Sequence, residues 1–156
     1  MAYSAYAVAN AFIQRAEQGR IPNLSPMKLQ KLLFFAQAWH LRGTGMPVLD
    51  DHFARWQYGP VIPALYHEFK AYGYMPITRK ATTLAADGSG FTMTVPNIPS
   101  QDEGTWSLID AIIARYGAYS AQTLSDMTHA DGSAWSRANP DGSVITTAEI
   151  LADQTI

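Results

Sequence analysis

The first half of the chain contains two clear helical patterns of apolar and polar positions. The first pattern lies between Ser4, a favourable N-cap residue, and Gly19, which can adopt the left-handed conformation that closes a helix. The second starts with Ser25 as the cap and Pro26 at the first helical position, and it runs until Gly43. Each pattern predicts a helix with one buried face. The apolar positions are Val8, Ala9, Phe12, Ile13 and Ala16 in the first and Leu29, Leu32, Leu33 and Ala36 in the second.

Three more helices are predicted in the second half of the chain. Ser100 and Glu103 have capping-box spacing in front of an apolar stripe that stops at Gly117. A short helix is expected from Ser120, and a terminal helix is expected to be capped by Thr146. The stripe consists of Leu108, Ile109, Ile112, Ile113 and Tyr116, the short helix runs through Leu124 and Met127, and Glu149 is the capping partner of Thr146.

Residues 77–95 change from the helical period to strict alternation. Phe91, Met93 and Val95 alternate with two threonines, and the preceding segment 87–90 is rich in residues that tolerate positive φ. The pattern predicts one β-hairpin with a threonine-rich outer face. Its exposed position also suggests a role in selecting a binding partner, because exposed loops tolerate variation.

The segment 53–70, "FARWQYGPVIPALYHEFK", is dense in aromatic residues, prolines and glycine. Gly59 and Pro60 end an extended stretch, and helical spacing then predicts a helix over residues 60–72. Trp56, Tyr58 and Tyr66 are more aromatic surface than a turn requires, so they are either core residues or the anchors of a binding surface. Together the patterns predict a mainly α, compact single domain over residues 1–156, with about five to six helices and one small β-hairpin.

Composition restricts the chemistry. The chain of 156 residues has no cysteine, which excludes disulfides, thiolate metal sites and a sulfur nucleophile. No stretch is apolar enough to span a bilayer and the first 20 residues do not resemble a signal peptide, so we expect a cytoplasmic protein without a membrane partner. We expect no cofactor, and the histidines lack the spacing of a metal site.

The net charge of −2 is unevenly distributed along the chain. Five basic residues and one acid lie in residues 1–42, whereas residues 101–156 carry eight acids and two arginines. The basic residues are too dispersed to track nucleic-acid phosphates, so the charge pattern disfavours nucleic-acid binding. Lys28 and Lys31 fall opposite the apolar stripe of their helix, which predicts a solvated face, or alternatively a basic strip that meets an acidic partner. Trp39, Trp106 and Trp135 are interpreted as core residues.

Three motifs carry a resemblance to a known family. They are "SPMKLQKLLFFAQAWHL" at 25–41, "RWQYGPVIPALYHEFKAYG" at 55–73 and "YSAQTLSDMTHADGSAW" at 119–135. In this order they resemble the Panacea domain family, which includes SocA-like and phage-associated GepA-like proteins, over about residues 5–150. A proline usually precedes the last tryptophan of the family pattern, and Ala134 takes that place here.

The resemblance implies a mostly helical antitoxin that neutralises a protein toxin encoded by an adjacent gene. In the SocA-like branch it also implies an adaptor that delivers the toxin to the ClpXP protease. The resemblance implies no catalytic residues. From the residues alone, the alternative is a small enzyme or a phage-encoded modulator that uses His129 with Asp126 or Asp131, although a hydrogen bond that anchors the last loop explains His129 more simply. The expected partner-binding residues are Trp56, Tyr58, Gly59, Pro60, Tyr66, Lys28 and Lys31.

Overall fold

The computed structural model describes residues 2–156, and six α-helices lie within them. The predicted mainly α fold, with about five to six helices and one small β-hairpin, is confirmed. The helices are α1 (Ala5–Glu17), α2 (Pro26–Thr44), α3 (Pro63–Phe69), α4 (Glu103–Tyr116), α5 (Ala121–Thr128) and α6 (Thr147–Ala152), with short 3₁₀ turns at Lys70–Tyr72 and Trp135–Arg137.

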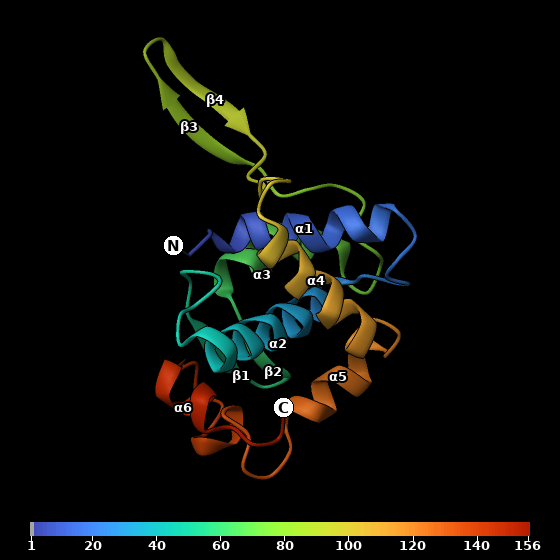
Figure 1. The fold of residues 1–156 in the computed structure, drawn as a ribbon, viewed down its shortest axis with the longest axis vertical. Helices are drawn as coiled ribbons and strands as arrows, with labels where there is room; N and C mark the ends of the chain where they lie inside the picture. The colour runs from blue at the N-terminus through green and yellow to red at the C-terminus, as the bar shows by residue number, and fades with distance from the viewer. Residues whose placement is uncertain (1) are drawn as a thin grey trace.

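The longest helix, α2, is the centre of the molecule (Figure 1). Helices α1, α3, α4, α5 and α6 all contact it, so it is surrounded rather than exposed on one side. Phe34 and Phe35 on α2 lie in the core, where Phe35 stacks on Tyr116 with a centroid distance of 4.2 Å. The predicted apolar stripes of α1 and α2 are buried, with Ala16 at their margin. Trp39, Trp106 and Trp135 are half-buried and pack against this core, as predicted.

The predicted caps are mostly confirmed. Ser4, Ser25 and Ser120 each accept a hydrogen bond from a backbone N–H of the first helical turn, and Thr146 forms the capping box with Glu149. Two boundaries of α2 and α4 differ from prediction. The cap of α4 is Asp102 rather than Ser100, and α2 continues past Gly43 to close at Gly45 with φ 75°.

A small three-stranded antiparallel sheet was not predicted. It consists of β1 (Phe53–Trp56), β2 (Gly59–Val61) and β5 (Val144–Ile145), in the order β2-β1-β5. The prediction of a helix over 60–72 is therefore wrong at its start. Pro60 lies in β2 opposite Arg55, and α3 begins at Pro63.

The second sheet is the predicted hairpin of β3 (Thr83–Asp87) and β4 (Gly90–Thr94), which projects away from the helical body (Figure 1). Its register places Leu84 opposite Met93 and Ala86 opposite Phe91, so these four side chains share one face. Thr83, Thr94 and Thr92 lie on the other face, as expected. The apolar face is exposed, however, instead of packing against the body.

Candidate functional site

The second and third sequence motifs meet at residues 56–58, where the chain turns from β1 into β2. Three side chains from α5 and the following loop contact three successive backbone carbonyls of this turn, so these carbonyls are paired and the turn is held in place. Trp135 Nε1 donates to Trp56 O at 2.8 Å, His129 Nε2 lies 3.0 Å from Gln57 O, and Ser125 Oγ donates to Tyr58 O at 2.7 Å.

Helix α2 holds the chain that follows the turn. The Gln30 side chain accepts from the Ile62 backbone N–H at 2.8 Å and donates to the Ile62 carbonyl at 3.0 Å. Lys31 Nζ donates to Pro60 O at 3.2 Å. The polar residues of the Lys-Leu-Gln-Lys motif thus bind backbone, which places the start of α3 against the core.

The prediction that Lys28 and Lys31 form a solvated basic face is wrong. They are 2% and 1% exposed, because α2 has neighbours around most of its circumference and has no fully solvated side along that stretch. Lys28 Nζ donates to Pro22 O at 2.7 Å. Burial lowers the pKa of both amines, that of Lys31 to about 7.

Position 59 requires glycine for two reasons, its backbone conformation and the lack of room for a Cβ atom. Its φ is +114°, and a Cβ added there would lie 2.7 Å from Thr128 Oγ1 and 2.8 Å from Lys31 Cε. Glycine adopts such a positive φ without the steric cost that a side chain would bring. The close approach shows that α2, β2 and α5 meet at this glycine.

Beside the turn lies a groove of about 770 Å³, which we call the aromatic groove. Trp56, Tyr58 and Tyr66 all line it, so the structure brings the three predicted rings together. The rings of Trp56 and Tyr66 meet edge to face, with centroids 4.9 Å apart. Trp56 is half-buried, whereas Tyr58 and Tyr66 are 60% and 42% exposed. Other lining residues, which the sequence analysis did not select, include Met27, Gln30, Arg55, Val61, Lys70 and Tyr74.

Arg55 connects the turn to the C-terminal part of the chain. It is 2% exposed, and its guanidinium donates to Glu149 and to the carbonyls of Ala134, Trp135 and Val144. Ala134, in the place of the usual family proline, donates its N–H to Asp153 Oδ2 at 2.9 Å. A proline has no N–H to make this bond. The last loop is therefore fixed here by a different interaction.

His129 has an anchoring position. Its Nδ1 lies near Ser125 O and its Nε2 near Gln57 O, and its ring packs on Trp135 with centroids 4.0 Å apart. Asp126 instead accepts a hydrogen bond from Gln122. The geometry does not support a catalytic pair of His129 with Asp126 or Asp131. Within residues 2–156, no three His, Asp or Glu side chains are grouped closely enough to hold a metal ion.

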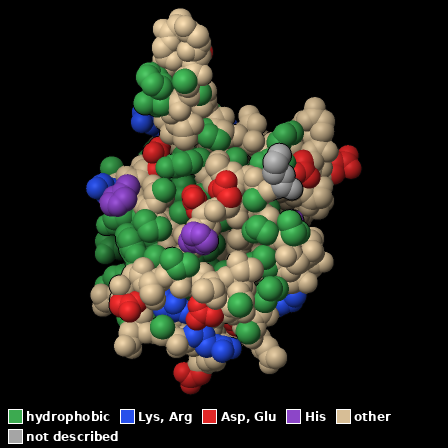
Figure 2. Space-filling view, turned by 90° about the vertical axis from the view of Figure 1, so that its left-hand side faces the viewer, with side chains coloured by type: hydrophobic (Ala, Val, Ile, Leu, Met, Phe, Trp, Pro, Cys, Tyr) green, Lys and Arg blue, Asp and Glu red, His purple; other side chains and the backbone are tan. Residues whose placement is uncertain are grey.

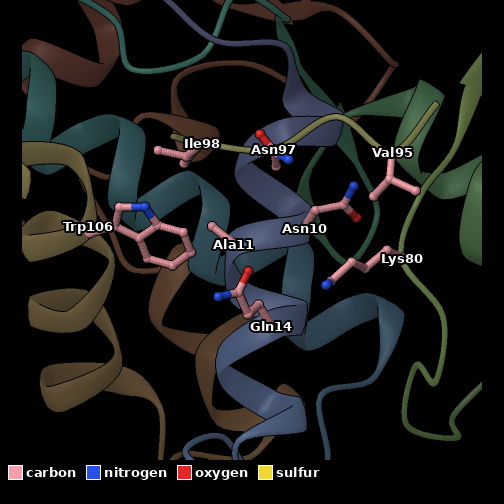
Figure 3. Close-up of a pocket in the computed structure, with 8 residues that line it drawn as sticks. All are labelled: Asn10, Ala11, Gln14, Lys80, Val95, Asn97, Ile98 and Trp106. Carbon is pink, nitrogen blue, oxygen red and sulfur yellow. The ribbon is translucent and has the colours of Figure 1, made fainter. Parts of the chain in front are cut away.

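The root of the hairpin is held by a residue that the sequence analysis did not select. Asn10 on α1 is buried, and its side chain bonds the N–H and C=O of Ala81 and the carbonyl of Pro96, at 2.7, 3.0 and 2.8 Å. These two residues flank the hairpin, so one amide fixes both of its ends. Figure 3 shows Asn10 at a cavity of about 70 Å³ beside Lys80 and Val95.

Comparison with known proteins agrees with the motifs. Residues 29–136 match the family model described as "Antitoxin SocA-like, Panacea domain". The chain is 34% identical over 131 residues to "Antitoxin SocA" of Caulobacter vibrioides (strain NA1000 / CB15N). The aligned region covers 84% of this chain and 68% of that protein. No solved structure matches the chain. Among the described helices, none is both long and apolar enough to cross a membrane.

Proposed function

The chain belongs to the SocA-like antitoxin family defined by the Panacea domain, and we propose that it neutralises a protein toxin, encoded by an adjacent gene, by binding it directly in the cytoplasm. One observation carries the proposal. Side chains of the third motif hold the 56–58 turn of the second motif, and around this turn exposed aromatic rings border an apolar groove. The protein acts as a binding module and not as an enzyme.

The rings suit this role energetically. Rigid aromatic side chains give large contact area at a small cost in conformational entropy, and such anchors commonly lose about 2 kcal/mol or more of binding when they are truncated. Tyr58 and Tyr66 are exposed beside the half-buried Trp56, and the backbone beneath them is already ordered. Little further ordering is needed when a partner binds.

The hairpin supplies a second contact and selects the partner. Leu84, Phe91 and Met93 are 66%, 75% and 63% exposed on one face, and Figure 2 shows hydrophobic side chains on the projecting hairpin at the top of the view. Exposed apolar faces of this kind are typical of interaction sites. Because Asn10 holds the hairpin at its root, the exposed part of the hairpin can vary among relatives without disturbing the core.

Co-expression tests the function. The reading frame beside this gene is expressed alone and together with the antitoxin, and growth is recorded. We expect growth arrest by the neighbour alone, rescue by co-expression, and a stoichiometric complex of the two purified proteins. Neutralisation by direct binding is contradicted if the neighbouring protein is harmless, or if co-expression restores growth without a complex between the two proteins.

The same complex can be delivered to a protease. To separate delivery from inhibition alone, the toxin half-life is measured after protein synthesis is blocked, in cells with and without ClpXP. Delivery predicts that the antitoxin shortens the toxin half-life only when ClpXP is present. An unchanged half-life together with full rescue would leave direct inhibition as the mechanism.

A further inference from the structure

The aromatic groove has an unbalanced charge. Lys31, Arg55 and Lys70 line it, and no aspartate or glutamate is among its lining residues. The Arg55 guanidinium is paired with Glu149, but the four ion pairs found in residues 2–156 include neither Lys31 nor Lys70. The groove therefore combines apolar rings with two amines that lack a carboxylate partner within the described chain.

Lys31 is the more unusual of the two amines because it is buried. Its side chain runs beneath Gly59, and its Nζ would lie 3.3 Å from a Cβ at that position. The ammonium has three donors, and the hydrogen bond to Pro60 O uses one of them. An ammonium removed from water without an opposite charge is unfavourable, and burial accordingly lowers its pKa to about 7.

Resting on the toxin-binding function proposed above, we infer that the aromatic groove binds an apolar segment of the toxin that carries a carboxylate, and that Lys31 at the floor of the groove recognises this carboxylate. The apolar part of the segment packs on Trp56, Val61 and Tyr66. Lys70 at the exposed edge adds a second positive charge. A carboxylate beside Lys31 supplies the opposite charge that the folded chain lacks, which makes an acid-containing segment preferable to a neutral one.

Short peptides test this recognition without the toxin. A phage-displayed library of random linear peptides is selected on the wild-type protein. The best peptide is then synthesised with its acid and with the matching amide, Asp→Asn or Glu→Gln. We expect selected peptides to combine an acid with aromatic or aliphatic residues. We expect the amide version to bind the wild type about tenfold more weakly, which corresponds to about 1.4 kcal/mol.

Two lysine variants locate the effect. Lys31→Met is expected to bind the acid and amide peptides equally, whereas Lys28→Met, a matched buried lysine on the same helix outside the groove, should keep the preference. Tyr66→Ala should weaken both peptides. The inference is overturned if no peptide is selected, if the selected peptides lack acids, if the wild type does not distinguish acid from amide, or if Lys31→Met distinguishes them as the wild type does.

Failure of the acid–amide comparison is informative even if Lys31→Met does not fold, because that comparison uses the wild-type protein. It is also separable from failure of the proposed function. If the protein neutralises the toxin but does not prefer acidic peptides, only this inference is contradicted. If it prefers acidic peptides but the neighbouring protein is not toxic, only the antitoxin function is contradicted.

Discussion

Gly59→Ala is the sharpest test of the way in which the motifs converge. The residue has φ +114°, which L-residues rarely adopt, and its new Cβ would meet Thr128 Oγ1 at 2.7 Å and Lys31 Cε at 2.8 Å. Both distances are shorter than van der Waals contact. The substitution therefore introduces backbone strain and steric overlap at the junction of α2, β2 and α5.

The two effects can be estimated separately. Placing a side chain at positive φ costs roughly 1 kcal/mol or more, and overfilling a packed site costs about 1–3 kcal/mol. We expect a loss of about 2–4 kcal/mol in the free energy of unfolding. For a chain of this length that corresponds to a decrease in Tm of roughly 5–15 °C.

Urea unfolding and thermal melting measure the loss, and a second glycine is the control. Gly132 has φ +84° with no atom within 4 Å of an added Cβ, so Gly132→Ala should show the strain without the overlap. The double variant Gly59→Ala with Thr128→Ala should recover part of the overlap energy, since the nearer contact is removed. The reasoning is refuted if Gly59→Ala is no more destabilising than Gly132→Ala.

Three other predictions follow from buried and exposed features. Asn10→Ala should lower the free energy of unfolding by about 2–4 kcal/mol, because it leaves backbone groups of Ala81 unpaired. It should also accelerate amide hydrogen exchange at the hairpin root, and unchanged exchange contradicts the anchoring role of Asn10. The Lys31 pKa of about 7 lies below its ordinary value of 10.5, so burial of the ammonium destabilises the fold below pH 7, and stability is gained as the pH rises from 7 to 10.5. The stability of Lys31→Met relative to wild type should thus be highest below pH 7 and decline towards pH 10.5 in urea titrations; a difference independent of pH contradicts this. The double variant Phe91→Ser with Met93→Ser should leave Tm nearly unchanged, because both side chains are exposed, but it should weaken toxin binding. The control Thr92→Ser should alter neither Tm nor binding. An unaltered toxin affinity of the double variant counts against a role of the hairpin.

Local chemistry predicted much of the helical structure. Ser4, Ser25, Ser120 and Thr146 cap helices because each is followed by a pattern that needs a side-chain acceptor, and this information lies within a few residues. The three-stranded sheet was missed for the opposite reason. Its strand at Val144–Ile145 pairs with Phe53 and Ala54, far away in the sequence, and is too short to show a period.

The candidate site was predicted in part. Trp56, Tyr58 and Tyr66 do border one groove, but Lys28 and Lys31 are buried, because a stripe on one face gives no information about what covers the other face. The importance of Asn10 and Arg55 depends on backbone partners from distant segments. Only the fold brings those partners together.

The most direct test of the account is the rescue of cells from the toxin by variants in which one ring is truncated. Trp56→Ala, Tyr58→Ala and Tyr66→Ala are measured for rescue and for Tm, with Tyr119→Ala as an exposed tyrosine outside the groove. We expect Tyr58→Ala or Tyr66→Ala to lose rescue while Tm stays within roughly 1–2 °C of wild type, as for other exposed positions, and Tyr119→Ala to keep both. If every truncation that loses rescue also unfolds the protein, the rings serve only the fold and the aromatic groove is not the toxin-binding surface.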